Sequence, residues 1–375
     1  MNEIPITQAR LRPGVIDLGL GNPDFSLLPL ERLHKSAETY FQGGDSRSLQ
    51  YGAEQGDGYF RHALADFLTS DYGSQVDPDL LFVTAGASSA LDLICTLYTQ
   101  PGDTIFVEEP SYFLALRVFK DHGLQVISIP MDEDGLRLDT LEESLTQYHP
   151  KLVYTIPTFQ NPSGCTLTQE RRDRMVEFAR QYDFIILADE VYHSLPYSQT
   201  PPKPFAAYSE DNSQVISVNS FSKILAPGLR LGWIQAHKTV IKRLAGCGLL
   251  DSGGGMNPFT SALVRSLIES GGLADNVAVL RREYAHRLNT LDTALRQYLP
   301  SAEYITPQGG FFFWVRLPGV DAAELRQRAQ EFHVDFRPGV LFSSQGGMRD
   351  TLRLCFSFYK SLEIEEGVKR LRNSL

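Results

Sequence analysis

The chain has 375 residues, of which 42% are hydrophobic and 21% charged, an ordinary composition for a globular protein of two or three domains. The formal net charge of -10 and the lack of a long basic run exclude the electrostatic footprint of a nucleic-acid-binding protein. No apolar stretch approaches the roughly 18 residues of a membrane span, and the first residues lack the apolar core of a signal peptide. We therefore expect a cytoplasmic protein with neither nucleic acid nor membrane as partner.

The four cysteines lie far apart in the sequence, at Cys95, Cys165, Cys247 and Cys355. They have neither the CxxC spacing of a zinc or redox site nor the density of a disulfide scaffold. We expect them to be reduced and structural, and we expect no metal site.

The N-terminal arm, residues 1–30, holds two segments interrupted by proline and no clear element, so it could pack against either domain. From about residue 80, short apolar runs alternate with longer amphipathic runs, which is typical of βα units around a largely parallel sheet. Strands are predicted in 80–86, 104–110, 151–157, 184–190 and 214–220, and helices in 88–100 and 111–123.

The C-terminal part begins after a glycine-rich turn at 251–258. Apolar residues recur there every three or four positions, and later stretches alternate like strands. The fold class is therefore α/β, with a large domain over 31–270 that contains the mostly parallel sheet, and a smaller α+β domain over 271–375. Helices are predicted in 261–270, 278–299 and 322–332, and strands in 309–318 and 352–358.

Several polar or small residues follow the predicted strands directly. Ligands in open α/β sheets bind outside the carboxyl ends of the strands, so one crevice could collect these side chains. The residues in question are Gly86, Tyr112, Asn161, Asp189 and Ser220.

The stretch VNSFSKILAPGLRLGW, residues 218–233, surrounds Lys223 with groups suited to an anion. Ser220 and Ser222 supply hydroxyl donors, and Arg230 supplies a planar, permanently charged fork that fits phosphate. A proline–glycine turn before Arg230 lets the chain fold back toward the lysine. A lone lysine is usually a solvated charge, but this neighbourhood favours a phosphate-bearing ligand beside a reactive amine.

The pattern S-x-S-K-x-x-x-P-G-x-R-x-G-W resembles the lysine motif of fold-type I pyridoxal 5'-phosphate (PLP) aminotransferases of class I and II, and further matches occur in order along most of the chain. The resemblance implies the fold of that family, with a seven-stranded type of sheet, and makes Lys223 the residue that forms a Schiff base with PLP. Once freed, the amine would move a proton between substrate and cofactor. This role needs an unprotonated lysine, which desolvation near a cation favours.

The resemblance also implies the groups around the cofactor ring. Asp189 would keep the pyridine nitrogen protonated, while Tyr192 and Asn161 would contact the 3'-oxygen. Tyr112 would stack on the ring. From the residues alone, Asp189 is better explained as a helix cap and Asn161 as a turn residue, while Tyr112 fits the core as well as it fits a functional role.

At the phosphate, the resemblance implies a cradle at the junction of a strand and a helix. Gly86, Ala87 and Ser88 would offer backbone N–H groups there, as helix N-termini do. Ser220, Ser222 and Arg230 would complete this cradle. Tyr51 matches a tyrosine that reaches the phosphate of the neighbouring subunit, so the resemblance implies a homodimer with composite sites.

At the substrate end, Arg353 matches an arginine that pairs in a bidentate manner with the substrate α-carboxylate, a geometry that lysine cannot copy. Gly21 and Asn161 would lie near the same carboxylate. For the side chain the sequence leaves alternatives open. A distal carboxylate could be bound by Arg10, Arg12 or Arg32, whereas the apolar residues 27–30 would suit an aromatic or aliphatic side chain.

Residues 21–29 and 54–68 look most like the subgroup of 2-aminoadipate aminotransferases, which includes the aminotransferase-like half of MocR-type regulators. Such regulators carry a DNA-binding winged helix ahead of this fold, whereas this acidic chain starts at the fold itself, so we favour an enzyme. We expect an aminotransferase that moves an amino group between an L-amino acid and a 2-oxo acid by a ping-pong mechanism. A PLP-dependent β-lyase on the same fold is the alternative, and a non-catalytic sensor is disfavoured by the intact site residues.

Overall fold

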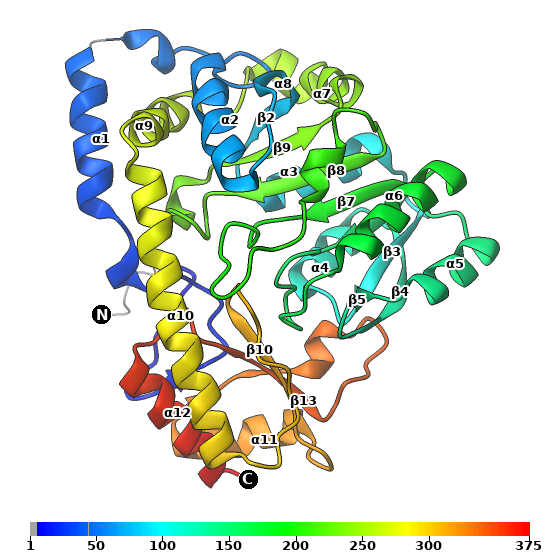
Figure 1. Cartoon of the computed structure of the whole chain (residues 1–375), viewed down its shortest axis with the longest axis vertical. Helices are drawn as coiled ribbons and strands as arrows, with labels where there is room; N and C mark the ends of the chain where they lie inside the picture. The colour runs from blue at the N-terminus through cyan, green and yellow to red at the C-terminus, as the bar shows by residue number, and fades with distance from the viewer. Residues whose placement is uncertain (1–5, 44) are drawn as a thin grey trace.

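The structure, a computed structural model, describes residues 6–43 and 45–375 (Figure 1). Its centre is a mixed eight-stranded sheet. In spatial order the strands are β2 (Leu81–Thr84), β9 (Gly232–Ala236), β8 (Val215–Ser220), β7 (Ile185–Asp189), β6 (Leu152–Thr155), β3 (Thr104–Glu109), β4 (Gln125–Asp132) and β5 (Gly135–Leu136). The pairs from β8 through β4 are parallel, and the pairs at both edges are antiparallel.

All five strands predicted for the large sheet are present as β2, β3, β6, β7 and β8. The sequence analysis missed β4 and β9. β9 follows the lysine loop directly and pairs antiparallel with both neighbours, although α7 follows it as helices follow the predicted strands. The parallel centre matters for function, because it directs the carboxyl ends of β6, β7 and β8 to one edge of the sheet.

Helices cover both faces of this sheet, so its strands are buried on both sides. Alternate residues of one strand consequently pack in different cores. On β3, Ile105 and Val107 belong to the core formed with α3 and α4, while Phe106 belongs to the core formed with α5 and α6. The helices of this part are α2 (Gly58–Tyr72), α3 (Ala87–Tyr98), α4 (Phe113–Asp121), α5 (Leu138–Gln147), α6 (Gln169–Tyr182), α7 (Lys238–Ala245) and α8 (Gly248–Gly253).

A second, three-stranded antiparallel sheet lies in the C-terminal part, in the order β10 (Phe312–Arg316), β13 (Thr351–Cys355), β12 (Arg337–Pro338). In Figure 1 the long helix α10 (Gly272–Tyr298) runs from the large sheet down to this part. It packs against α9 (Pro258–Glu269) and α12 (Ser361–Asn373), and α11 (Ala322–Ala329) lies beside β12. The predicted elements of this region are therefore confirmed.

The N-terminal segment is joined to the C-terminal part. β1 (Ile16–Asp17) pairs in parallel with β11 (Val334–Asp335), and α1 (Leu30–Gly43) packs against α9. The domain boundaries at residues 30 and 270 stay predictions. The pairing of β1 with β11 indicates that the N-terminal arm packs with the C-terminal part. Within the described residues, no helix is long and apolar enough to cross a membrane. The short 3-10 helices are η1 (Phe25–Leu27), η2 (Ser46–Leu49), η3 (Pro78–Leu80), η4 (Phe205–Tyr208), η5 (Pro227–Leu229), η6 (Gln330–Phe332) and η7 (Gly339–Phe342).

Gly56 fixes the close approach of the segment after Tyr51 to strand β2. Its φ is 101°, and a Cβ atom added there would lie 2.2 Å from Cγ2 of Val83. The next hydrogen bond holds the two segments together, because the Val83 N–H donates to the Gln55 carbonyl at 3.0 Å. A side chain at position 56 thus meets both a strained backbone and an occupied space.

We expect the Gly56→Ala substitution to lower the free energy of unfolding by about 2 to 4 kcal/mol, because backbone strain and overpacking add. Gly73→Ala is the matched control, since Gly73 has a φ of 67° but nothing within 4 Å of an added Cβ. It should cost only the backbone strain, about 1 kcal/mol. Urea denaturation measures both losses, and equal losses would contradict the steric argument.

Candidate active site

A cavity of about 360 Å³ lies at the carboxyl ends of the central strands and extends to the small sheet. It brings together almost all of the predicted site residues. Those that line it are Gly21, Ala87, Ser88, Tyr112, Asn161, Asp189, Tyr192, Ser220, Ser222, Lys223, Arg230 and Arg353.

Lys223 follows β8 and reaches into this cavity. Its Nζ donates to the Gly21 carbonyl at 3.3 Å and lies 5.5 Å from the centroid of the Phe311 ring. The pKa of Lys223 is lowered to about 8, chiefly by burial; the charge of Arg353 also lowers it, while Cys355 and Asp189 raise it. The amine is therefore closer to neutral near physiological pH than a solvent-exposed lysine.

Asp189 ends strand β7 on the floor of the cavity and is buried. Its Oδ2 accepts a hydrogen bond from the Tyr154 hydroxyl at 2.9 Å, whereas Oδ1 has no partner. Burial raises the pKa of Asp189 to about 6, although the bond from Tyr154 opposes the shift. An unpartnered carboxylate oxygen in a buried site is costly, and a protonated pyridine nitrogen is a donor that would satisfy it.

The opposite end of the cavity collects groups that suit an anion. Helix α3 begins at Ala87 after Gly86, whose φ is 92° and whose missing side chain leaves room for Arg230, because an added Cβ would lie 3.0 Å from Arg230 Nη2. Arg230 donates only to two carbonyls, those of Ala85 and Pro227, both at 3.2 Å. Its charge is thus not neutralised by a carboxylate of the described structure, and it lies beside a helix N-terminus.

The hydroxyls of Ser220 and Ser222 border this end as well. Ser220 Oγ lies 2.9 Å from Ser222 Oγ and accepts the Ser222 N–H at 3.1 Å, which fixes the turn that leads to Lys223. The two serines of the cradle and the lysine are therefore parts of one turn after β8. The residues of this end fit the phosphate of PLP as the sequence analysis proposed.

Arg353 lies on β13 at the far side of the cavity and is only 4% exposed. Its Nη1 donates to Asn161 Oδ1 at 2.8 Å and its Nη2 to the Gly19 carbonyl at 2.9 Å. The guanidinium stacks between two rings, 4.1 Å from the Phe312 centroid and 4.9 Å from the Phe342 centroid. Burial lowers the pKa of Arg353 to about 10, so it stays protonated near neutral pH and suits a carboxylate ligand.

Tyr192 and Tyr112 flank the cavity between these two ends. The Tyr192 ring meets Phe311 and Phe312 edge to face, with centroids 5.3 and 5.9 Å apart. Tyr112 caps the start of α4, and burial raises its pKa to about 12, so its hydroxyl remains protonated. Both aromatic rings can therefore contact a planar ligand.

Two predicted cofactor residues do not line this cavity: Gly86, which directly precedes the lining residue Ala87, and Tyr51, which lies on a different surface. Tyr51 is 79% exposed and borders a different surface pocket with Tyr59 and Arg265. A residue of one subunit that serves the site of another has to point outward in this way. The position of Tyr51 therefore agrees with the predicted composite site and leaves that prediction open.

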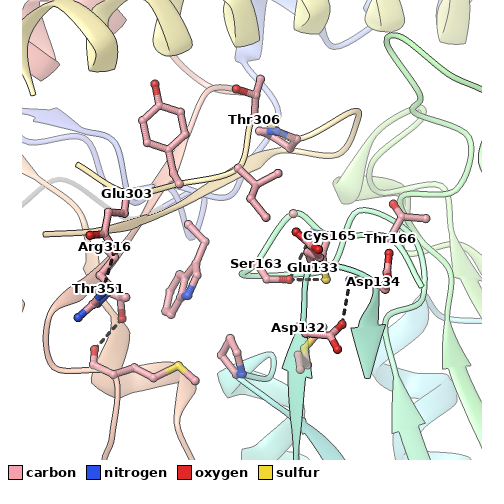
Figure 2. A pocket seen from close by; sticks show the side chains of 18 of the residues that line it. Asp132, Glu133, Asp134, Ser163, Cys165, Thr166, Glu303, Thr306, Arg316 and Thr351 are labelled. Atoms are coloured by element: carbon pink, nitrogen blue, oxygen red, sulfur yellow. Dashed lines mark hydrogen bonds and ion pairs between the residues drawn. The ribbon is translucent and has the colours of Figure 1, made fainter. Parts of the chain in front are cut away.

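A larger cavity, of about 610 Å³, lies beyond the loop that carries Asn161. Figure 2 shows Asp132 and Glu303 on opposite sides of it, and Glu303 accepts from Arg316 at 2.8 Å. Its lining contains neither Lys223 nor Arg353. Because chemistry depends on the side chains rather than on size, we assign the active site to the smaller cavity.

Glu108 and Tyr154 support the site, and the sequence analysis missed both. Glu108, buried at the end of β3, accepts from Thr155 Oγ1, from the Ile156 N–H at 3.0 Å and from Gln160 Nε2 at 3.1 Å, which orders the loop before Asn161. The sequence signal that could have identified them is a polar side chain near the end of an otherwise apolar strand. Both fall within predicted strands, and neither was given a role there.

Comparison with known proteins agrees with this geometry. Residues 13–371 match the family model described as aminotransferase class I and II. The chain belongs to this family. As a member of it, the protein is a PLP-dependent aminotransferase, whose substrates are amino acids and oxo acids.

Two curated relatives and one solved structure cover nearly the whole aminotransferase. The aromatic-amino-acid aminotransferase 1 of Thermococcus litoralis is 35% identical, over 96% of this chain and 88% of the relative. The 2-aminoadipate transaminase of Thermus thermophilus is 31% identical, over 97% of this chain and 91% of the relative. The kynurenine aminotransferase of Pyrococcus horikoshii, solved in complex with PMP, superposes with a TM-score of 0.90 at 33% identity, over 96% of this chain and 90% of that one.

The charges around Lys223 predict how its pKa responds to substitution in the cofactor-free aminotransferase. Arg353→Met removes a positive neighbour and should raise the pKa of Lys223 above its value of about 8, while Asp189→Asn removes a negative neighbour and should lower it. NMR titration of ¹³C-methylated lysines measures both shifts, with Lys223→Arg identifying the signal. If Lys223 of the unsubstituted protein titrated near the midpoint of a solvent-exposed lysine, the burial argument would be contradicted.

Proposed function

We propose that this aminotransferase accepts L-amino acids of more than one side-chain class and transfers their amino group to a 2-oxo acid by a ping-pong mechanism. The observation that carries the proposal is the single cavity in which Lys223, Asp189 and Arg353 converge. Asp189 and Arg353 hold the two ends of the reacting system, and Lys223 lies between them as a base. These roles require the three charges in this spatial order.

PLP, when bound, supplies a ring that withdraws electrons from the α-carbon of the substrate. We assign to Asp189 Oδ1 the hydrogen bond from the ring nitrogen, and to Arg230 and the N-terminus of α3 the phosphate. Arg353 orients the substrate through its α-carboxylate. Lys223 Nζ then takes the proton from the α-carbon, and its pKa near 8 suits an amine that accepts and returns a proton close to neutral pH.

The lining of the cavity supports apolar side chains among the substrates. Leu20, Phe113 and Leu114 line it. The relatives named above act, by their names, on aromatic amino acids, 2-aminoadipate and kynurenine, and this range also supports broad specificity. We further propose that the enzyme works in the cytoplasm, consistent with its four free cysteines.

A half-reaction screen tests this proposal. The holoenzyme, mixed with phenylalanine, kynurenine or 2-aminoadipate and no oxo acid, should convert its bound cofactor to the amine form once per site, which absorbance follows. Lys223→Ala should slow this conversion by at least about 10³-fold, because it removes the base. A β-lyase on the same fold would instead release pyruvate and ammonia over many turnovers from a substrate with a β leaving group, and that result would contradict the proposal.

We also propose a homodimer with composite sites, as the resemblance implied. The surface around Tyr51 carries exposed apolar side chains, including Leu49 at 68% and Tyr59 at 66% exposure. Phe41, at the end of α1, is 64% exposed and packs near Phe259 of α9, with centroids 6.2 Å apart. An apolar surface of this kind is suited to burial against a second copy of the chain.

Subunit mixing distinguishes a composite site from a self-contained one. We expect Tyr51→Phe to weaken PLP binding about 10-fold, since one hydrogen bond to a charged group is lost. Dimers that combine Lys223→Ala in one subunit with Tyr51→Phe in the other should then regain one fully functional site. If Tyr51 served its own subunit, neither site of the mixed dimer would be intact, and affinity and turnover would stay low.

A further inference from the structure

A second arginine, Arg337, lines the cavity that contains Arg353. The two residues are directly opposite each other in the antiparallel register of β12 and β13, so their side chains emerge on the same face. Gly19 separates them: its carbonyl accepts from Arg353 Nη2 at 2.9 Å, and a Cβ added to it would lie 2.6 Å from Arg337 Nη1. Two guanidinium groups thus border the substrate end of one cavity.

The present partner of Arg337 holds it loosely. Its Nη1 and Nη2 each lie 3.2 Å from the carboxylate oxygens of Asp17, at the long end of hydrogen-bond distances. By contrast, Arg12 and Asp335 in the same network are 2.6 Å apart. Asp17 is fixed independently, because its Oδ1 accepts the Gly19 N–H at 2.8 Å. Arg337 can therefore exchange partners without releasing Asp17.

The charges of this network do not balance. It contains three arginines, Arg12, Arg326 and Arg337, and two carboxylates, Asp17 and Asp335. One positive charge therefore remains when both carboxylates are paired. Arg337 is the arginine of the three that lines the cavity, with 21% of its side chain exposed, so a carboxylate arriving there would neutralise the excess.

We propose that Arg337 binds the distal carboxylate of dicarboxylic amino acids and of the matching 2-oxo acids, while Arg353 binds the α-carboxylate. This inference rests on the proposed function and names one substrate class for it. When the substrate side chain is aromatic or aliphatic, Arg337 stays with Asp17, and no buried charge loses its partner. One cavity can thereby serve both classes.

The arginines that the sequence offered for this role are placed elsewhere. Arg12 pairs with Asp335 and is 48% exposed, while Arg32 lies 3.4 Å from Asp275 on the surface. Neither these two nor Arg10 lines the cavity. The assignment therefore passes from the N-terminal arm to strand β12.

A matched pair of substrates tests the proposal. 2-Aminoadipate and norleucine differ in the distal carboxylate and have the same chain length, so the ratio of their kcat/KM values isolates its contribution. Arg337→Met should lower this ratio by about 10- to 100-fold, the value of a charge-assisted hydrogen bond. The change should appear in KM for 2-aminoadipate rather than in kcat, because the contact is made equally in the ground and transition states. Arg32→Met, which removes an arginine outside both the cavity and the network of Asp17 and Asp335, is the control and should leave the ratio unaltered.

Asp17→Asn provides the opposite change. The amide oxygen can still accept the Gly19 N–H, but the competing charge is gone, so the ratio should rise. Arg337→Lys keeps the charge without the fork and should give an intermediate ratio. If Arg337 were only structural, its substitution would change kcat/KM for both substrates by the same factor. A variant that still transfers the amino group of norleucine and shows an unaltered ratio therefore overturns the inference. The proposed function itself is refuted if the unsubstituted enzyme does not convert its cofactor with 2-aminoadipate, norleucine or phenylalanine.

Discussion

The guanidinium of Arg353 connects the three segments from which the active site is built. Its bonds reach Asn161 in the loop after β6 and Gly19 in the N-terminal segment, while its own strand, β13, belongs to the small sheet. Burying such a charge is costly unless oxygen atoms and aromatic faces replace water around it. The amide, the carbonyl and the rings of Phe312 and Phe342 supply that replacement, so the site and the contact between both sheets depend on the same group.

The site also contains polar groups that lack a hydrogen-bond or carboxylate partner within the described structure. Asp189 Oδ1 and Arg353 Nε are buried without a hydrogen bond, and Arg230 faces only carbonyls. The two buried atoms cost free energy in the folded chain, and the surrounding cores have to offset that cost, whereas Arg230 is exposed. A ligand with a protonated ring nitrogen at one end and anionic groups at the others would satisfy them together.

Much of this arrangement could be predicted from the sequence. The stretch 218–233 places serines, lysine and arginine close together, so local spacing sets this half of the phosphate end, while the start of α3 supplies the other half. The apolar runs before Asn161 and Asp189 locate both at the carboxyl edge of the sheet. The roles of individual residues still rest on resemblance, since neither Asp189 nor Asn161 is distinctive without its spatial neighbours.

Arg337 could not have been found in this way. It precedes a proline and a glycine in a two-residue strand, and its position in the cavity depends on pairing with Arg353 and on the path of Gly19, which lies more than half the chain away. The strand β9 was missed for a related reason, because antiparallel pairing with β2 and β8 leaves no periodic mark that distinguishes it. Long-range pairing decides such features, and a single sequence records it poorly.

The parallel pairing of β1 with β11 has a consequence for the order in which the protein matures. Ile16 leaves the ribosome among the first residues, yet its partner Val334 is among the last. Gly19 and Gly21, whose carbonyls accept from Arg353 and Lys223, follow shortly after this unpaired strand. The nascent chain can therefore complete its central sheet well before the mouth of the active site takes shape, and catalytic competence arrives only when synthesis is almost finished.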